Sequence, residues 1–155
     1  MRSLFLLSAL FFSQSFSSGN SPSDFFDPTG TYILKGEVTR NKVTSHSGEI
    51  RVQLIDSDRI AICFYINKGY PGYESGSFLD TISYDNGTAR CYPGKDSSCM
   101  ILFYFYQKRL ELRTSYSQPN ICCGFAKGAL TSAVFKKASA DKPIIQDLSV
   151  HGVAP

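Results

Sequence analysis

The chain has little of what most enzymes need. Its 155 residues include no tryptophan, two methionines and two histidines. His46 stands in a polar stretch and His151 in the C-terminal tail, without the His-Glu-x-x-His or Cys-x-x-Cys spacing of zinc or thioredoxin-like sites. No Gly-x-Ser-x-Gly elbow or phosphate-binding glycine loop occurs either. We therefore predict a protein that is not an enzyme, with no catalytic residues, metal or cofactor.

Apolar runs long enough to span a membrane are also missing. Met1-Arg2 precede an apolar run from Leu4 to Phe12 that only Ser8 interrupts, and small residues follow. This pattern predicts a secretory signal peptide over residues 1–18, too short to span a membrane, with a buried N-terminal helix as the less favoured alternative. No cysteine precedes Cys63, so the signal for a bacterial lipid anchor is missing. We expect a secreted or periplasmic protein with its signal peptide cleaved and no membrane span.

Neither positive nor negative side chains dominate the chain. The chain has 16 Lys and Arg against 13 Asp and Glu, a formal net charge of +3 that becomes +2 when Arg2 is removed with the signal peptide. Such a scattered balance gives no electrostatic reason to expect a nucleic acid or a lipid surface as partner. After the signal peptide we predict a loose Ser/Pro/Asp linker over 19–29, one domain over 30–139 and a tail over 140–155.

The centre of the chain is a stretch of uncharged residues from Cys99 to Tyr106, half of them aromatic. It is rich in β-formers, and Gln107-Lys108 joins it to an alternating run from Arg109 to Arg113. Six more runs have strand character, and no amphipathic helix is evident. The expected strands cover residues 31–35, 49–54, 59–66, 77–84, 88–92, 99–106, 109–113 and 127–137. We predict an all-β fold, an antiparallel eight-stranded meander closing into a small lipocalin-like barrel, with an open β-sandwich as the alternative.

The predicted connections differ at the two ends of this barrel. Tight turns at 56–58, 85–87 and 107–108 fall at one end, and longer loops around 36–48, 67–76, 93–98 and 115–126 fall at the other, which we call the mouth. Function, if it is local, is expected at the mouth, because binding residues are commonly carried on loops.

The five cysteines allow fifteen patterns of two bridges and one leftover thiol, so counting does not decide the pairing. Four of them lie in or beside the mouth loops: Cys91, Cys99, Cys122 and Cys123. Cys63 alone lies in the middle of a strand, on the face opposite Phe64, and is the expected free thiol.

The mouth loop with the sequence Tyr70-Pro71-Gly72-Tyr73 is the strongest candidate for a binding site. Tyrosine is enriched at contact hot spots, although one of these two rings could instead fold down to cap the barrel. Glu74 and Asp80 flank the loop and could form an acid/base pair, but a solvated surface pair is favoured. The predicted binding residues are Tyr70, Pro71, Tyr73, Glu74 and Phe125.

Residues 27–139 resemble a family of small exported bacterial β-proteins. The matching segments are Asp27–Tyr32, Lys68–Pro71, Ser75–Phe78, Ser98–Cys99, Cys123–Phe125 and Phe135–Lys137. The resemblance implies a lipocalin-like or lysozyme-inhibitor-like barrel, a Cys99–Cys123 bridge and no catalytic residues. Ala126 departs from the Cys-Gly-Phe-Gly pattern of such proteins, and the additional Cys122 is a candidate partner for Cys91.

The leading functional prediction is a non-enzymatic exported binding module whose mouth loops contact a protein or a glycan, with a lysozyme-type hydrolase as one candidate. A +2 chain gains no electrostatic steering toward a basic lysozyme. The alternative is a carrier of a small apolar ligand inside the barrel, although the rings of residues 100–106 would fill that space. A hydrolase is the least favoured alternative, since a Cys–His nucleophile is rare where exported cysteines are bridged.

Overall fold

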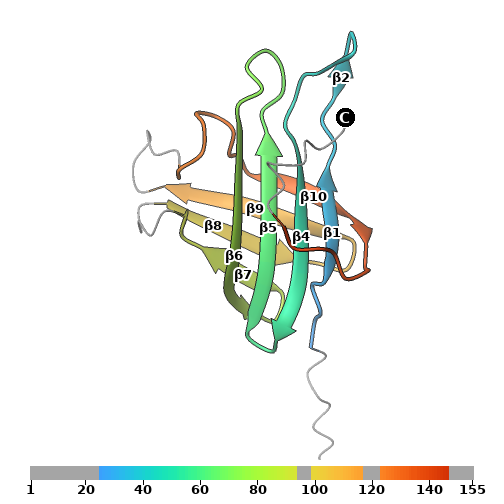
Figure 1. Cartoon of the computed structure of the whole chain (residues 1–155), viewed down its shortest axis with the longest axis vertical. Coiled ribbons are helices and arrows are strands. Elements are labelled where there is room, and N and C mark those ends of the chain that lie inside the picture. Colours follow the sequence, from blue (N-terminus) through green and yellow to red (C-terminus); the bar gives the residue numbers. More distant parts are fainter. Residues whose placement is uncertain (1–24, 94–98, 117–122, 147–155) are drawn as a thin grey trace, which may run out of the picture.

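The computed structural model describes residues 25–93, 99–116 and 123–146, and within these ranges the protein is all-β (Figure 1). The strands are β1 (Gly30–Leu34), β2 (Val38–Thr39), β3 (Lys42–Val43), β4 (Ser47–Asp56), β5 (Arg59–Asn67), β6 (Ser75–Asp85), β7 (Thr88–Cys91), β8 (Cys99–Phe105), β9 (Arg109–Tyr116) and β10 (Ala133–Ser139). Eight of them close into a barrel in the order β1-β10-β9-β8-β7-β6-β5-β4, and β2 and β3 form a separate hairpin.

The barrel closes because β1 pairs antiparallel with both β4 and β10. Every other neighbouring pair in the barrel is also antiparallel, so no strand of it is left as an edge. The predicted antiparallel eight-stranded barrel is confirmed, and the open sandwich is wrong. Closure satisfies the backbone N–H and C=O groups that the two edges of an open sheet would leave unpaired.

Several strands extend beyond the predicted bounds, such as β4 at Ser47–Asp56 and β9 at Arg109–Tyr116, and two further differences change the course of the chain. The last strand begins at Ala133 rather than near residue 127, because Gly124 and Gly128 both have φ of +78° and turn the chain before it can extend. The polar stretch 36–48 contains the β2–β3 hairpin, whose turn residues Arg40 and Asn41 also have positive φ. Arg-Asn is a weaker turn signal than Asn-Gly, so the sequence did not indicate this hairpin.

The barrel interior is filled with aromatic rings. In β8 the alternation places Ile101, Phe103 and Phe105 inward and leaves the residues between them partly exposed. Phe64 of β5 is at the centre, since its ring centroid lies 6.4 Å from that of Phe103 and 6.4 Å from that of Phe135. Large rings bury the most apolar area per residue, so this cluster is the main source of hydrophobic stabilisation.

The end of the barrel with the tight turns is covered by residues 25–29, the last part of the expected linker. The N–H of Phe26 donates to Oδ1 of Asn86 at 2.8 Å, and the hydroxyl of Tyr84 donates to the carbonyl of Phe26. Phe26 also packs against the core. These residues therefore close this end of the barrel instead of lying loose in solvent.

Within the described ranges, no helical segment has the length and apolarity that crossing a bilayer requires.

Candidate functional site at the barrel mouth

The topology brings the long connections together at one end of the barrel. The segments between β1 and β4, between β5 and β6 and between β9 and β10 all extend from this end (Figure 1). The first and the third of these segments are also bonded to each other, since Nε2 of His46 lies 2.9 Å from the carbonyl oxygen of Gly128. Parts of two mouth connections, residues 94–98 and 117–122, lie outside the described residues.

Residues 69–73, which we call the tyrosine loop, are held by backbone hydrogen bonds. The N–H of Tyr70 donates to the carbonyl of Val43 in β3 at 2.7 Å. The N–H of Tyr73 donates to the carbonyl of Gly69 at 2.8 Å, and the amide of Asn67 donates to the carbonyl of Tyr73 at 2.8 Å. The β2–β3 hairpin thus supports the loop from one side, and the end of β5 supports it from the other.

Both tyrosine side chains point outward. Tyr70 is 46% exposed and Tyr73 is 47% exposed, so neither folds down to cap the barrel. Their rings meet edge to face with centroids 6.3 Å apart, and Nζ of Lys42 lies 4.1 Å from the centroid of Tyr70. Pro71, which follows Tyr70 through a cis peptide, is exposed on the same loop. The mouth therefore presents a fixed aromatic pair with a lysine against it.

Phe125 has a different place from the other predicted binding residues. It is 8% exposed, with its ring centroid 5.8 Å from that of Phe64 and 6.4 Å from that of Phe78. Gly76 of β6 lies directly beneath the ring. Phe125 therefore plugs the mouth from inside, and it supports the loops rather than facing solvent.

Glu74 ends the tyrosine loop with an ion pair. Its carboxylate lies 3.4 Å from Nζ of Lys68 and is folded beneath Gly72. A hydrogen bond from its own backbone N–H, together with the charge of Lys68, lowers the pKa of Glu74. Asp80 is six positions further along the chain, about 20 Å away in an extended strand. The two carboxyl groups therefore cannot act on one substrate atom as an acid/base pair.

The cysteines divide into one bridge and two buried thiols. Cys99, at the start of β8, is bridged to Cys123, with the two Cα atoms 5.5 Å apart. Among the described residues Cys63 and Cys91 are free, and burial raises the pKa of Cys91 to about 11. Cys122 lies outside the described residues, so its pairing with Cys91 is untested and stays a prediction.

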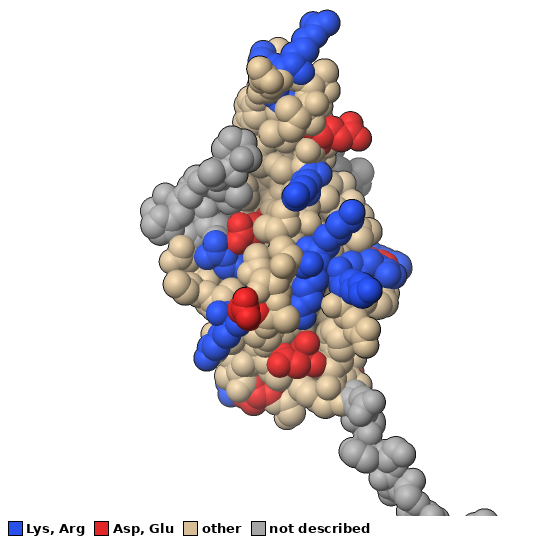
Figure 2. All heavy atoms as spheres, turned by 90° about the vertical axis from the view of Figure 1, so that its right-hand side faces the viewer, with Lys and Arg blue, Asp and Glu red and all other residues tan. Residues whose placement is uncertain are grey.

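The mouth is richer in cations than the chain as a whole. Its described loops carry five cationic side chains against the two carboxylates of Glu37 and Glu74. The cations are Lys35, Arg40, Lys42, Lys68 and Lys127. Figure 2 shows Lys and Arg at the tip of the molecule, where Figure 1 places the β2–β3 hairpin. Of these cations only Lys68 has an ion-pair partner among the described residues.

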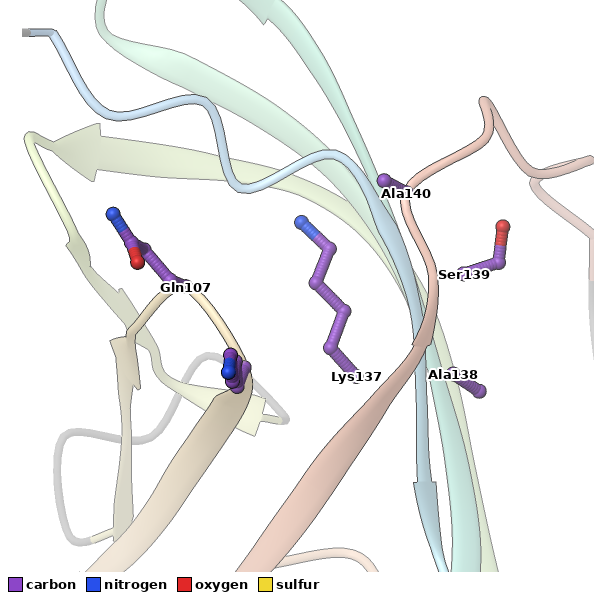
Figure 3. Close-up of a pocket in the computed structure, with 6 residues that line it drawn as sticks. Gln107, Lys137, Ala138, Ser139 and Ala140 are labelled. Carbon is purple, nitrogen blue, oxygen red and sulfur yellow. The ribbon is translucent and has the colours of Figure 1, made fainter.

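A pocket lies away from the mouth, beside the turn between β8 and β9 (Figure 3). This shallow pocket of about 300 Å³ is lined by Gln107, Lys108, Lys137, Ala138, Ser139 and Ala140. In Figure 3 the Lys137 side chain extends into the space beside Gln107. Its Nζ lies 5.4 Å from the centroid of Tyr32, and burial lowers the pKa of Lys137. The lining combines the polar ends of two lysines, Gln107 and Ser139 with the methyl groups of Ala138 and Ala140, so it is mixed in polarity.

Among the described residues, no three His, Cys, Asp or Glu side chains are grouped so that they could hold a metal ion. No protein-family model, curated protein or solved structure matches the chain. The resemblance to exported bacterial β-proteins therefore stays a prediction, and the function must be argued from the mouth itself.

Proposed function

We propose that this protein is a non-enzymatic exported binding module that contacts a protein or glycan partner through its mouth. One observation carries the proposal: Tyr70 and Tyr73 are each nearly half exposed on a loop that hydrogen bonds hold in place. Exposed tyrosines on an ordered scaffold supply large contact area at little cost in conformational entropy. Pro71 between them limits the freedom of the loop further.

The supports beneath the loop favour the same function. The Cys99–Cys123 bridge and the buried ring of Phe125 hold the 123–132 segment against the mouth. A surface that is ordered before binding loses less entropy when a partner docks. The mouth therefore has the properties of a preorganised contact surface.

The alternative of an apolar-ligand carrier is less favoured. Phe64, Phe103 and Phe135 are fully buried in the barrel interior, where such a ligand would have to sit. A hydrolase remains least favoured, because Glu74 is paired with Lys68 and, in the parts of the mouth loops that the structure describes, no exposed nucleophile is hydrogen-bonded to a side-chain base.

A lysozyme-type partner is one defined candidate, and the charge of the mouth argues against it. Five cations with two carboxylates would repel a basic hydrolase rather than steer it. A lysozyme is therefore best used as one probe among several.

The test uses the mature chain and two double variants. Wild-type protein, Tyr70→Ser/Tyr73→Ser and the matched control Tyr104→Ser/Tyr106→Ser, on the barrel flank, are immobilised and exposed to three probes. The probes are purified lysozyme, peptidoglycan fragments and the exported protein fraction of the source cells. We expect a partner whose affinity falls about tenfold or more in the mouth variant only, as for hot-spot tyrosines.

Equal retention of every bound component by both double variants would contradict the proposal. Turnover of a probe by the wild-type protein would contradict its non-enzymatic part. Circular dichroism and thermal unfolding of the three proteins serve as the folding control.

A further inference from the structure

Cys63 is buried on the side of the barrel wall that should face solvent. It alternates with Phe64, which points into the barrel, and it pairs across the sheet with Arg51 of β4 and Leu79 of β6. Leu79, on the same outer face, is 50% exposed, whereas Cys63 is 0% exposed. Something outside the barrel must therefore cover the thiol.

The cover is the C-terminal segment 140–146, which we call the strap. It begins with a turn in which the N–H of Asp141 donates to Oγ of Ser139 at 2.9 Å. Nη1 of Arg51 then donates to the carbonyl of Ile144 at 3.4 Å, and the backbone N–H of Gln146 lies near the sulfur of Cys63. Figure 1 shows the dark red strap crossing β4 toward β5.

On the outer face of β4, near the strap, a charged side chain is buried and paired. Glu49 of β4 is 8% exposed although it is charged, and its carboxylate forms an ion pair with Nε of Arg51. Arg51, which belongs to the barrel wall, therefore bonds both the Glu49 carboxylate and the Ile144 carbonyl of the strap. This pairing satisfies the charges that the strap shields from water.

An accessible thiol at position 63 would endanger the mouth. A Cys63 thiolate that attacked a sulfur of another molecule's Cys99–Cys123 bridge would form a new disulfide and expel the other sulfur as a thiolate. The same attack on a small disulfide would leave a mixed disulfide on the protein and release one small thiolate. Either reaction needs the sulfur to be reached and deprotonated.

We propose that the strap is a shield that keeps the Cys63 thiol out of thiol–disulfide exchange while the mouth bridge is in place. Burial raises the pKa of Cys63, which slows the same reactions. The strap lies on the surface and has few buried side chains, so it should open locally without unfolding of the barrel.

The test measures attack by 5,5′-dithiobis(2-nitrobenzoate) on the unreduced full chain, with each modified cysteine located by peptide mass spectrometry. Ile145→Asp places a carboxylate at a half-buried strap position, and Ile144→Asp is the matched control at a position 72% exposed. We expect Cys63 to be modified at least about tenfold faster in the Ile145 variant and within about twofold of wild type in the control.

Cys91 reports on global unfolding in a Cys122→Ser chain, where the predicted Cys91–Cys122 pairing cannot form, because Cys91 is buried and belongs to the core cluster. In that chain at increasing urea, Cys63 should react at concentrations where Cys91 is still protected, since only the strap has to open. Identical urea dependence at the two cysteines would overturn the proposal. So would fast modification of Cys63 in the wild-type protein, or an unchanged rate in the Ile145 variant.

Discussion

The ring of Phe125 lies on the bare backbone of Gly76, in the place that a side chain at position 76 would occupy. This contact lets the 123–132 segment approach β6 and puts the ring against Phe64 and Phe78. The glycine is needed here for close approach rather than for an unusual backbone angle. The position of the 123–132 segment at the mouth therefore requires a residue without a Cβ at position 76.

Gly76→Ala should therefore displace Phe125 and destabilise the protein by about 1–3 kcal/mol, the usual effect of overpacking a core. Urea unfolding measures the loss, and Ser75→Ala, at an exposed position next to it, is the control. In Gly76→Ala/Phe125→Leu the smaller side chain at position 125 should relieve the overlap. The double variant should therefore lose less free energy of unfolding than the two single variants lose together. Strict additivity would contradict the contact.

Removal of the mouth bridge should lower the free energy of unfolding. Cys99 and Cys123 are 24 positions apart, and a loop of that size gives about 3 kcal/mol in the chain-entropy model. Cys99→Ser/Cys123→Ser is compared with wild-type protein by urea unfolding, with and without reductant. The reductant should destabilise the wild type by more than the double variant. A similar response of both proteins would show that the bridge adds no stability.

Alkaline pH should destabilise the barrel through Tyr84. Burial raises the pKa of Tyr84 to about 12, while the unfolded chain titrates near 10.0. Between these values the folded protein keeps a proton that the unfolded chain has lost, so the free energy of unfolding falls as the pH rises. The stabilisation is complete below pH 10 and is lost progressively through about pH 12.

Tyr84→Phe should reduce this slope, as measured by unfolding at several pH values. Comparison at pH 7 isolates the loss of its hydrogen bond to Phe26. A slope as steep as that of the wild type in this variant would assign the alkaline loss to other groups.

Hydrogen exchange should be slowest in β5. This strand lies between β4 and β6, and both its faces are covered, the inner face by the core and the outer face at Cys63 by the strap. The amides of residues 60–66 should exchange more slowly than those of 109–116, because Arg113 and Ser115 of β9 are exposed. Faster exchange in β5 than in β9 would contradict this ranking.

Local pattern was sufficient for most of the barrel. The alternation in residues 49–54 and the Asn86-Gly87 turn signal can both be read from residues adjacent in the chain. In the structure β4 includes residues 49–54 and the β6–β7 turn lies at Asn86-Gly87, as predicted. The tyrosine loop was also predictable, because Pro71 and the flanking glycines limit it to a turn. The bridge was expected from the resemblance, and its Cα spacing is that of an ordinary disulfide.

Long-range contacts could not be predicted from local pattern. The support of Tyr70 by the Val43 carbonyl joins backbone groups 27 positions apart, and a backbone acceptor has no sequence signature. Lys42 was missed for the same reason, since its place over Tyr70 depends on a hairpin with an unusual turn. Alternation correctly put Cys63 on the outer face, but its burial depends on the strap, whose residues show no periodicity.

The seam between β1 and β10 determines when the barrel can form during synthesis. Ile33 pairs with Lys136, more than 100 positions later in the chain, whereas the partners of β1 on its other side are in β4. A ribosome has therefore made nearly the whole domain before the first strand gains its second neighbour. Until then both sides of the growing sheet are open to pairing with other chains, and contacts of such long sequence separation form slowly. Completion of β10 thus converts a sheet with two open edges, which is prone to aggregation, into a closed barrel wall.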